Sequence, residues 1–280
     1  MSAVNKSDWK PAHEAHAIER VSATFQFKEA VPTKRWHTLV NSASSKLAQD
    51  FGFGHSFETV EFNVPSIVGQ QVVWQGGPSP APTGRAFQII QGAEWLEEVN
   101  LQRTRFVYSA TRYTRWQAFR TRTSGILSQY LKLALEDVDL ALVKLEYWDR
   151  FVFDGKATEA NYETLFNANS KYVSQFALSA PDLWHSHVGY FVPAPTGKRL
   201  VNLNIDLIDL NESNLLPGSE VTTRRSAGLY SMVQNTIELQ FEALEDVYAD
   251  MDRLHTMLID IMRDVVTPQV AKQISLSPEA

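Results

Sequence analysis

The sequence predicts an α+β protein built from two tandem β-α-β(n)-α halves, each an antiparallel sheet packed on a long helix. Two observations lead to this prediction. The pentapeptide Pro-Ala-Pro-Thr-Gly occurs at Pro80–Gly84 and again at Pro193–Gly197, each time followed by a basic residue. Around each copy the residue pattern has the same order: a strand, a helix, further strands and a long helix. We therefore expect an internal duplication, although Pro, Thr and Gly are also common turn residues that can coincide by chance.

The first half is expected at residues 17–137. Val21–Phe27 alternates apolar and polar residues, which is the period of a strand with one buried face. Pro32 then opens a helix, because apolar residues recur every three or four positions until Gly52. Strands are expected at 55–64, 86–91, 94–101 and 103–111. From Arg115 the period returns to that of a helix, which closes the half after roughly twenty residues.

The second half is expected at residues 138–268. Leu140–Phe153 alternates as Val21–Phe27 does, and Thr158–Tyr172 has a weaker helical pattern. Strands are expected at 183–192, 200–210 and 224–239. Phe241–Val265 is the clearest helix, with Leu254 and Leu258 on an apolar stripe broad enough to cover a sheet face. Residues 1–16 and 269–280 are expected to be flexible tails.

Four segments of the chain share features with one protein family. They are the strand running from Ile18 toward Pro32, a hairpin like Trp95–Tyr108, the junction ending Leu145–Phe151, and a last helix with His255 and a Val-Val-Thr ending. On these segments the chain resembles a sporadically distributed bacterial and archaeal family of similar length and unassigned function. The resemblance implies architecture only. The expected halves also resemble tandem helix-grip domains like those of TATA-binding proteins, which implies pseudo-twofold symmetry and a groove or concave face.

Composition excludes several classes of protein. The 280 residues are 44% apolar and 21% charged, without an apolar run long enough to cross a membrane, so we expect a soluble protein without membrane contact. The N-terminus has no apolar secretory segment, and no secretion is predicted. The absence of cysteine excludes disulfide scaffolds, thiol nucleophiles and thiolate metal sites, and fits a reducing bacterial cytoplasm.

Compact catalytic and cofactor motifs are missing from the sequence. The Thr-Gly-Lys-Arg segment ending at Arg199 is not a phosphate loop, because Val192 stands where glycine is needed. No dinucleotide fingerprint, nucleophile elbow or zinc-protease motif is present, so no cofactor is predicted. The pairs His13/His16 and His185/His187 lack a third ligand at metal spacing, and no metal site is predicted. His255 is expected to pack in the core or an interface with one hydrogen bond rather than to catalyse.

One window of the chain is strongly basic. Val99–Leu135 contains no Asp or Glu and has a formal charge of +7, so the rest of the chain, from a total of −6, carries −13. Arginines alternate there with aromatic residues, a mixture suited to binding phosphates and stacking on bases. The anion-binding candidates are Arg103, Arg105, Arg112, Arg115, Arg120 and Arg122, and the stacking candidates are Tyr108, Tyr113 and Trp116. The alternative is that these arginines pair with the acidic remainder of the fold or cover a sheet edge.

Two functions remain open. The first is a non-catalytic binding or assembly module of a bacterial cytoplasmic system that recognises another protein, itself or an anionic ligand such as nucleic acid. The second is an enzyme with a dispersed active site that acts on a phosphate-containing or nucleic-acid substrate. The missing motifs favour the first. An enclosed pocket with a carboxylate or histidine in hydrogen-bonding reach of the arginines would favour the second.

Overall fold

The computed structural model describes residues 8–13, 15–57, 66–68, 71–73, 84–180, 182–212 and 222–276. The strands are β1 (Trp9–Pro11), β2 (Ile18–Phe27), β3 (Phe53–Phe57), β4 (Ser66–Val68), β5 (Gln71–Val73), β6 (Gly84–Gln91), β7 (Glu94–Gln102), β8 (Arg105–Ala110), β9 (Leu140–Phe153), β10 (His185–Ala194), β11 (Gly197–Glu212) and β12 (Thr222–Thr236). The helices are α1 (Thr33–Phe51), α2 (Trp116–Leu135), α3 (Gln175–Leu178), α4 (Leu244–Val265) and α5 (Pro268–Gln273).

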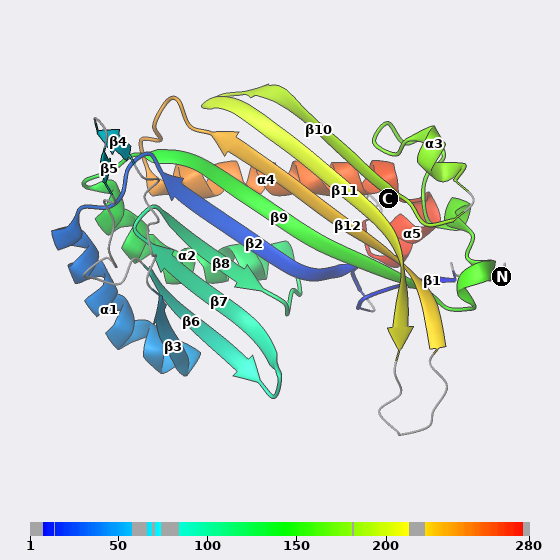
Figure 1. Ribbon diagram of the computed structural model, residues 1–280, viewed down its shortest axis with the longest axis horizontal. Coiled ribbons are helices and arrows are strands. Elements are labelled where there is room, and N and C mark those ends of the chain that lie inside the picture. Colours follow the sequence, from blue (N-terminus) through cyan, green and yellow to red (C-terminus); the bar gives the residue numbers. More distant parts are fainter. Residues whose placement is uncertain are drawn as a thin grey trace.

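One large antiparallel sheet organises the described residues. Its strand order is β10-β11-β12-β9-β2-β8-β7-β6-β3, and β1 adds to β9. The two strands expected to open the halves lie next to each other at its centre, where Ala23 of β2 is opposite Leu145 of β9 (Figure 1). From this central pair the sheet extends outward through β8, β7, β6 and β3 on one side and through β12, β11 and β10 on the other. The α+β class is therefore confirmed.

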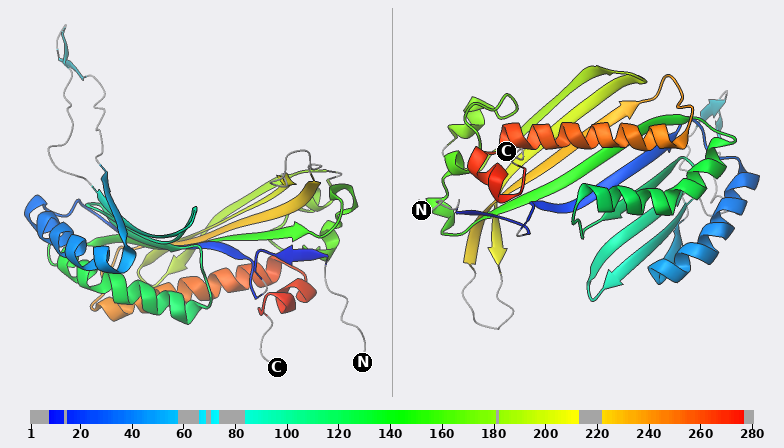
Figure 2. Two further views of the ribbon diagram at one scale, coloured as in Figure 1. Left: turned by 90° about the horizontal axis from the view of Figure 1, so that it is seen from below. Right: turned by 180° about the vertical axis from the view of Figure 1, so that it is seen from behind.

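The long helices cover one face of this sheet. Figure 2 shows α1, α2 and α4 along the same side, where α4 packs on β9 and β12, α2 on β8 and α4, and α1 on β6 and α2. Val21, Ala23 and Phe25 of β2 are fully buried, and the ring of Phe25 meets that of Tyr248 on α4 at a centroid distance of 6.1 Å. The alternation read from the sequence thus reflects one strand face turned toward the helices. Among the described residues no helix is long and apolar enough to cross a membrane.

Most of the expected elements form within a few residues of their expected ends. Leu140–Phe153 is a strand with those bounds, and α2 has 20 residues beginning next to Arg115. Helix α1 ends where Gly52 adopts a φ of 66°, in the left-handed region that glycine enters without steric cost. Of the strand expected at 55–64, only 55–57 lies within the described residues, where it belongs to β3.

The helix expected over Thr158–Tyr172 does not form. The segment contains two short 3-10 turns, η1 (Ala157–Glu159) and η2 (Tyr162–Thr164). Beyond them Leu165 and Phe166 are buried, and the Asn167 N–H donates to the Val265 carbonyl at 2.8 Å. This hydrogen bond to the end of α4 takes the place of a bond within a helix. Tertiary contacts therefore override the weak local pattern.

The two expected tails are partly ordered, which corrects the prediction for residues 1–16 and 269–280. Strand β1 pairs with β9, and Trp9 is fully buried with its indole N–H donating to the Asn161 carbonyl at 2.9 Å. At the other end Thr267 caps α5, whose Val270 is buried. The mainly polar composition of both segments did not indicate that they form ordered elements. One or two apolar side chains are enough to hold a short element against the rest of the protein.

The repeated pentapeptide does not mark equivalent positions. The second copy forms the turn between β10 and β11, where Gly197 has a φ of 152° and a Cβ would collide with the Thr236 carbonyl. Residues 80–83 of the first copy lie outside the described residues, and Gly84 begins β6. Two more strands separate β6 from α2, whereas one strand separates β11 from α4. The two copies therefore precede strands at different positions in the two expected halves. This sequence argument for duplication was wrong.

Replacing Leu258 by Ala is expected to lower the free energy of unfolding by about 2–5 kcal/mol. Leu254 and Leu258 are 0% and 1% exposed on α4, as expected, so truncation leaves a cavity against the sheet. Urea unfolding followed by circular dichroism measures the loss, with Thr256→Ala on the exposed face of α4 as control. A loss under about 1 kcal/mol with an unchanged oligomeric state would show that Leu258 is not a core residue.

Candidate functional site

The basic window is divided between two ends of β8. Arg103 lies in the turn before this strand and Arg105 begins it, whereas Arg112 and Arg115 follow it. A six-residue strand at about 3.3 Å per residue separates the two groups by roughly 20 Å. The Arg103 Nε donates to the Val31 carbonyl at 3.0 Å, and the Arg105 Nε donates to Gln102 Oε1 at 3.1 Å. The window therefore does not bring all six candidate arginines into one local site.

The last two candidate arginines form ion pairs inside the protein. Arg120 on α2 approaches Asp252 on α4, with 2.9 Å from Nε to Oδ2. Arg122 approaches Glu97 on β7, with 2.9 Å from Nε to Oε2. Both pairs are what the alternative interpretation of the window expects, because acids from distant segments neutralise these two arginines.

The three stacking candidates contact other parts of the protein. Tyr108 is 2% exposed, its ring stacks on Phe119 at 5.2 Å, and burial raises its pKa. It offers no face to a nucleic-acid base. Trp116 stacks on His255 at 4.2 Å and 8°, and Tyr113 meets Tyr147 edge to face at 5.9 Å. Since these rings already pack on side chains, we no longer treat them as a stacking platform for bases.

A groove of about 950 Å³ lies between α1 and α2. Its lining includes Lys46, Leu47, Asp50, Arg115, Arg122 and Gly125. The groove thus combines two arginines of the basic window with a lysine from the preceding helix. Gly125 leaves open space on α2, because a Cβ there would meet nothing within 4 Å. Packing within the described residues gives no reason for glycine at this helical position.

The groove has an excess of positive charge. Lys46 donates from Nζ to Gln129 Oε1 at 2.8 Å, a neutral partner. Arg115 is exposed and makes no ion pair with an acid in the described part of the chain. Of the remaining charged residues in the lining, Arg122 is paired with Glu97, and Asp50 is the one carboxylate. Two cations, Lys46 and Arg115, therefore remain for an anionic ligand.

A second, more polar pocket of about 680 Å³ opens beside Tyr113. It lies where the segment before β2, the β6–β7 turn and the β8–α2 loop meet, and its charged lining residues include Glu19, Glu94 and Arg112. Glu19 is already paired with Arg150 at 2.8 Å, and Arg112 has no ion pair with a described acid. This pocket lacks the paired acid and arginine that the enzyme hypothesis requires.

A cluster of buried titratable groups packs around Tyr113. The Tyr147 hydroxyl and His255 Nδ1 are 2.7 Å apart, and burial lowers the pKa of His255 to about 4. His255 thus has the packing role and hydrogen bond expected from the sequence. Burial, with a smaller contribution from Glu19, raises the pKa of the Asp149 carboxyl to about 8. Burial also raises the pKa of Tyr113 to about 12. The carboxyl and the imidazole are therefore both uncharged near pH 7.

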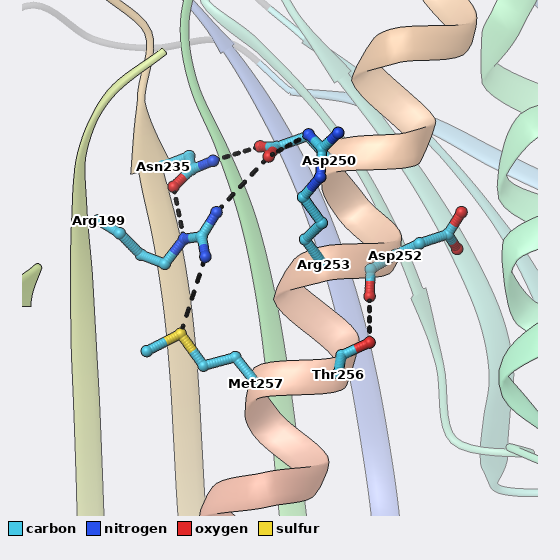
Figure 3. A network of polar contacts seen from close by, with 7 residues as sticks. All are labelled: Arg199, Asn235, Asp250, Asp252, Arg253, Thr256 and Met257. Atoms are coloured by element: carbon cyan, nitrogen blue, oxygen red, sulfur yellow. Dashed lines mark hydrogen bonds and ion pairs between the residues drawn. The ribbon is translucent and has the colours of Figure 1, made fainter. Parts of the chain in front are cut away.

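A network of polar side chains joins α4 to the sheet (Figure 3). Asp250 is fully buried on α4, and its carboxylate accepts a hydrogen bond from Asn235 on β12. Arg199 on β11 donates from Nε to Asn235 Oδ1 at 2.7 Å and lies 3.6 Å from Asp250. Burial lowers the pKa of the Arg199 guanidinium, an effect that the Asp250 carboxylate opposes. Because its members are already paired with one another, this network holds the fold together rather than offering a site.

The histidine pairs do not converge on a metal site. No group of three or more His, Asp or Glu side chains suited to a metal occurs among the described residues. His185 contacts Asp206 on the neighbouring strand, and His187 lies 2.6 Å from Asn202 Oδ1. His16 Nε2 is 2.7 Å from the Tyr113 carbonyl. His16, His185 and His187 therefore each have a local polar partner.

Comparison with known proteins gives no further assignment. No model of a known protein family matches the chain, and no curated protein sequence matches it significantly.

Proposed function

We propose that this protein is a non-catalytic binding module that takes a phosphate-bearing ligand in the groove between α1 and α2. The observation that carries the proposal is the pair of cations, Lys46 and Arg115, which line one groove without an acidic partner in the described residues. Their attraction for an anion is not already satisfied inside the protein. Lysine supplies a point charge and arginine a planar fork, both of which bind phosphate.

The size and lining of the groove support the same proposal. Its volume of about 950 Å³ lies within the usual range of ligand sites, roughly 300–1,000 Å³. Among the described residues Asp50 is the one carboxylate of its lining, which there contains no histidine. Acid–base catalysis requires a proton donor or acceptor near the bound phosphate. Asp149 and His255 of the buried titratable cluster do not belong to the described lining of the groove, which is why we propose binding without chemistry.

The binding module consists, in this proposal, of two related halves of helix-grip type. The mirrored strand order on either side of β2 and β9 supports this. So do two backbone hydrogen bonds that join the residues just after β8 and β12 to strand β7 and to the turn before β11, respectively. The Thr111 N–H donates to the Leu96 carbonyl at 3.0 Å, and the Glu238 N–H donates to the Thr196 carbonyl at 2.7 Å. A cytoplasmic location remains part of the proposal because the chain has no cysteine.

The double variant Lys46→Glu/Arg115→Glu is expected to weaken ligand binding at least ~10-fold, because both unpaired cations are reversed. Fluorescence anisotropy with a labelled single-stranded oligonucleotide measures this at low and moderate salt, and unlabelled ATP and inorganic phosphate serve as competitors. If the oligonucleotide is the ligand, losing two phosphate contacts reduces the salt slope by about 1.4. Competition by ATP alone would identify a nucleotide site instead.

The matched control is Arg103→Glu/Arg105→Glu, which makes the same charge change at the opposite end of β8. It should leave the affinity nearly unchanged. Equal losses in both double variants would show that binding follows net charge rather than the groove. Absence of binding by the native protein at low salt, with all three probes, would contradict the proposed function.

A further inference from the structure

Strand β10 forms a long and uncharged edge of the sheet. It spans His185–Ala194, and among the described strands it pairs with β11 alone. Its sequence, HSHVGYFVPA, contains no Lys, Arg, Asp or Glu. In the described part of the chain no further backbone hydrogen bond reaches these ten residues from their outer side. Figure 1 shows β10 as the outermost strand at this end of the sheet.

Such an edge is unusual for a strand that remains alone. Unpaired N–H and C=O groups along an edge invite pairing with another strand, and proteins commonly prevent it with charges, bulges or a short strand. The opposite edge, β3, has five residues within the described part of the chain. β10 has twice that length, keeps a continuous register with β11, and has Pro193 only near its end.

Apolar side chains are exposed along the same strand. Phe191 is 68% exposed, and Leu183, just before the strand, is 45% exposed. Val188, Tyr190 and Val192, on the other face of β10, are only partly buried. A strand added to this edge would cover apolar surface on both faces while satisfying the backbone groups.

We propose that β10 pairs with β10 of a second copy of this chain, antiparallel and about a twofold axis through Gly189. A twofold axis perpendicular to the sheet keeps the same face of both copies on the same side of the extended sheet. Residues that lie opposite each other must therefore be both odd-numbered or both even-numbered. With the axis at Gly189, His187 lies opposite Phe191 of the partner subunit, and Val188 lies opposite Tyr190 of the partner subunit. Apolar and aromatic residues then meet on both faces.

A second copy is the occupant that the charges favour. The chain has a net charge of −6, and this edge is a place where two copies can meet without opposing like charges. An antiparallel edge is also complementary to itself, so nine of the ten residues, His185–Pro193, can lie opposite residues of the same strand in the second copy. Gly189 has no side chain on the axis, which allows the strands to approach there.

Gly189 allows a sharp test, because a Cβ at this position would have only ordinary contacts, the nearest to His187 Nε2 at 3.7 Å. Gly189→Lys should therefore fold and should place two lysines directly opposite each other, weakening self-association at least ~10-fold. Gly189→Ala is the matched control and should leave it unchanged. Light scattering during size-exclusion chromatography and sedimentation over a concentration series measure the oligomeric state.

Cross-linking tests the register. The chain contains no cysteine, so a disulfide in Gly189→Cys can form only between copies. This variant should cross-link on mild oxidation, because the two positions are opposite each other within disulfide reach. Ser186→Cys should not, since its two copies would lie roughly 20 Å apart along the strands. A native protein that stays monomeric at all concentrations overturns the proposal. A dimer that tolerates Gly189→Lys and does not cross-link through Cys at position 189 also overturns it.

Discussion

Asp250→Ala is expected to lower the free energy of unfolding by about 3–5 kcal/mol, because it leaves a buried charge without its counterion. Asp250 is fully buried between α4 and the sheet, 3.6 Å from the Arg199 guanidinium (Figure 3). After the substitution Arg199 keeps its hydrogen bond to Asn235 but loses the carboxylate that compensates its burial. Urea unfolding followed by circular dichroism at neutral pH measures the change.

Asp260→Ala is the matched control on the same helix. Its side chain is 63% exposed and pairs with Arg263 one turn away, so the change should stay within about 0.5 kcal/mol. Replacing both members of the buried pair, as Arg199→Met/Asp250→Leu, should recover much of the stability lost in Asp250→Ala, since no buried charge remains unpaired. A loss below about 1 kcal/mol in Asp250→Ala would show that water compensates the buried charge of Arg199.

Local patterns predicted the elements of this protein better than their arrangement. The alternation of Leu140–Phe153 and the stripe of α4 each depend on neighbouring residues, and both elements form where expected. The pairing of β2 with β9 brings together segments more than a hundred residues apart. The sequence of neither strand specifies the other as its neighbour. Many strands that alternate apolar and polar residues could pair at the same place.

The candidate site was predictable only in part for the same reason. The sequence revealed the basic window, but the acids that neutralise Arg120 and Arg122 come from α4 and β7. Lys46 lies on α1, about seventy residues before the arginine that shares its groove. No local spacing could have placed Lys46 and Arg115 along one groove, since this depends on how α1 and α2 pack.

The burial of Asp149 could have been predicted from its position in the alternating pattern of β9. Asp149 continues the series Leu145, Tyr147 and Phe151, the positions of β9 whose side chains are buried. A carboxyl on the buried face of a strand loses much of its hydration, which raises its pKa. The sequence therefore contained a signal for this residue, in the alternation of β9 rather than in a compact motif.

Asp149→Asn is expected to stabilise the protein increasingly as the pH rises from about 4 to about 8. Burial first, and then the Glu19 carboxylate, raise the pKa of Asp149 from 3.8 to about 8. Between these values the folded protein keeps the proton and the unfolded chain has released it, so the native protein loses about 1.4 kcal/mol per pH unit from this group. The favourable contribution of the Asp149 carboxyl to the free energy of unfolding is complete below pH 4 and lost above pH 8. An Asn side chain does not titrate and makes no such pH-dependent contribution.

The free energies of unfolding of the native protein and of Asp149→Asn should therefore diverge by a few kcal/mol between pH 5 and pH 8, as roughly expected for one such group. Taking the difference between the two proteins removes the titration of groups that both contain, including Tyr113, Tyr147 and His255, apart from their coupling to Asp149. Asp260→Asn, on the exposed side of α4, is the control and should show no comparable divergence. A constant difference between the native protein and Asp149→Asn across this range would mean that the Asp149 carboxyl is ionised in the folded protein, and that water or a rearranged neighbour solvates it.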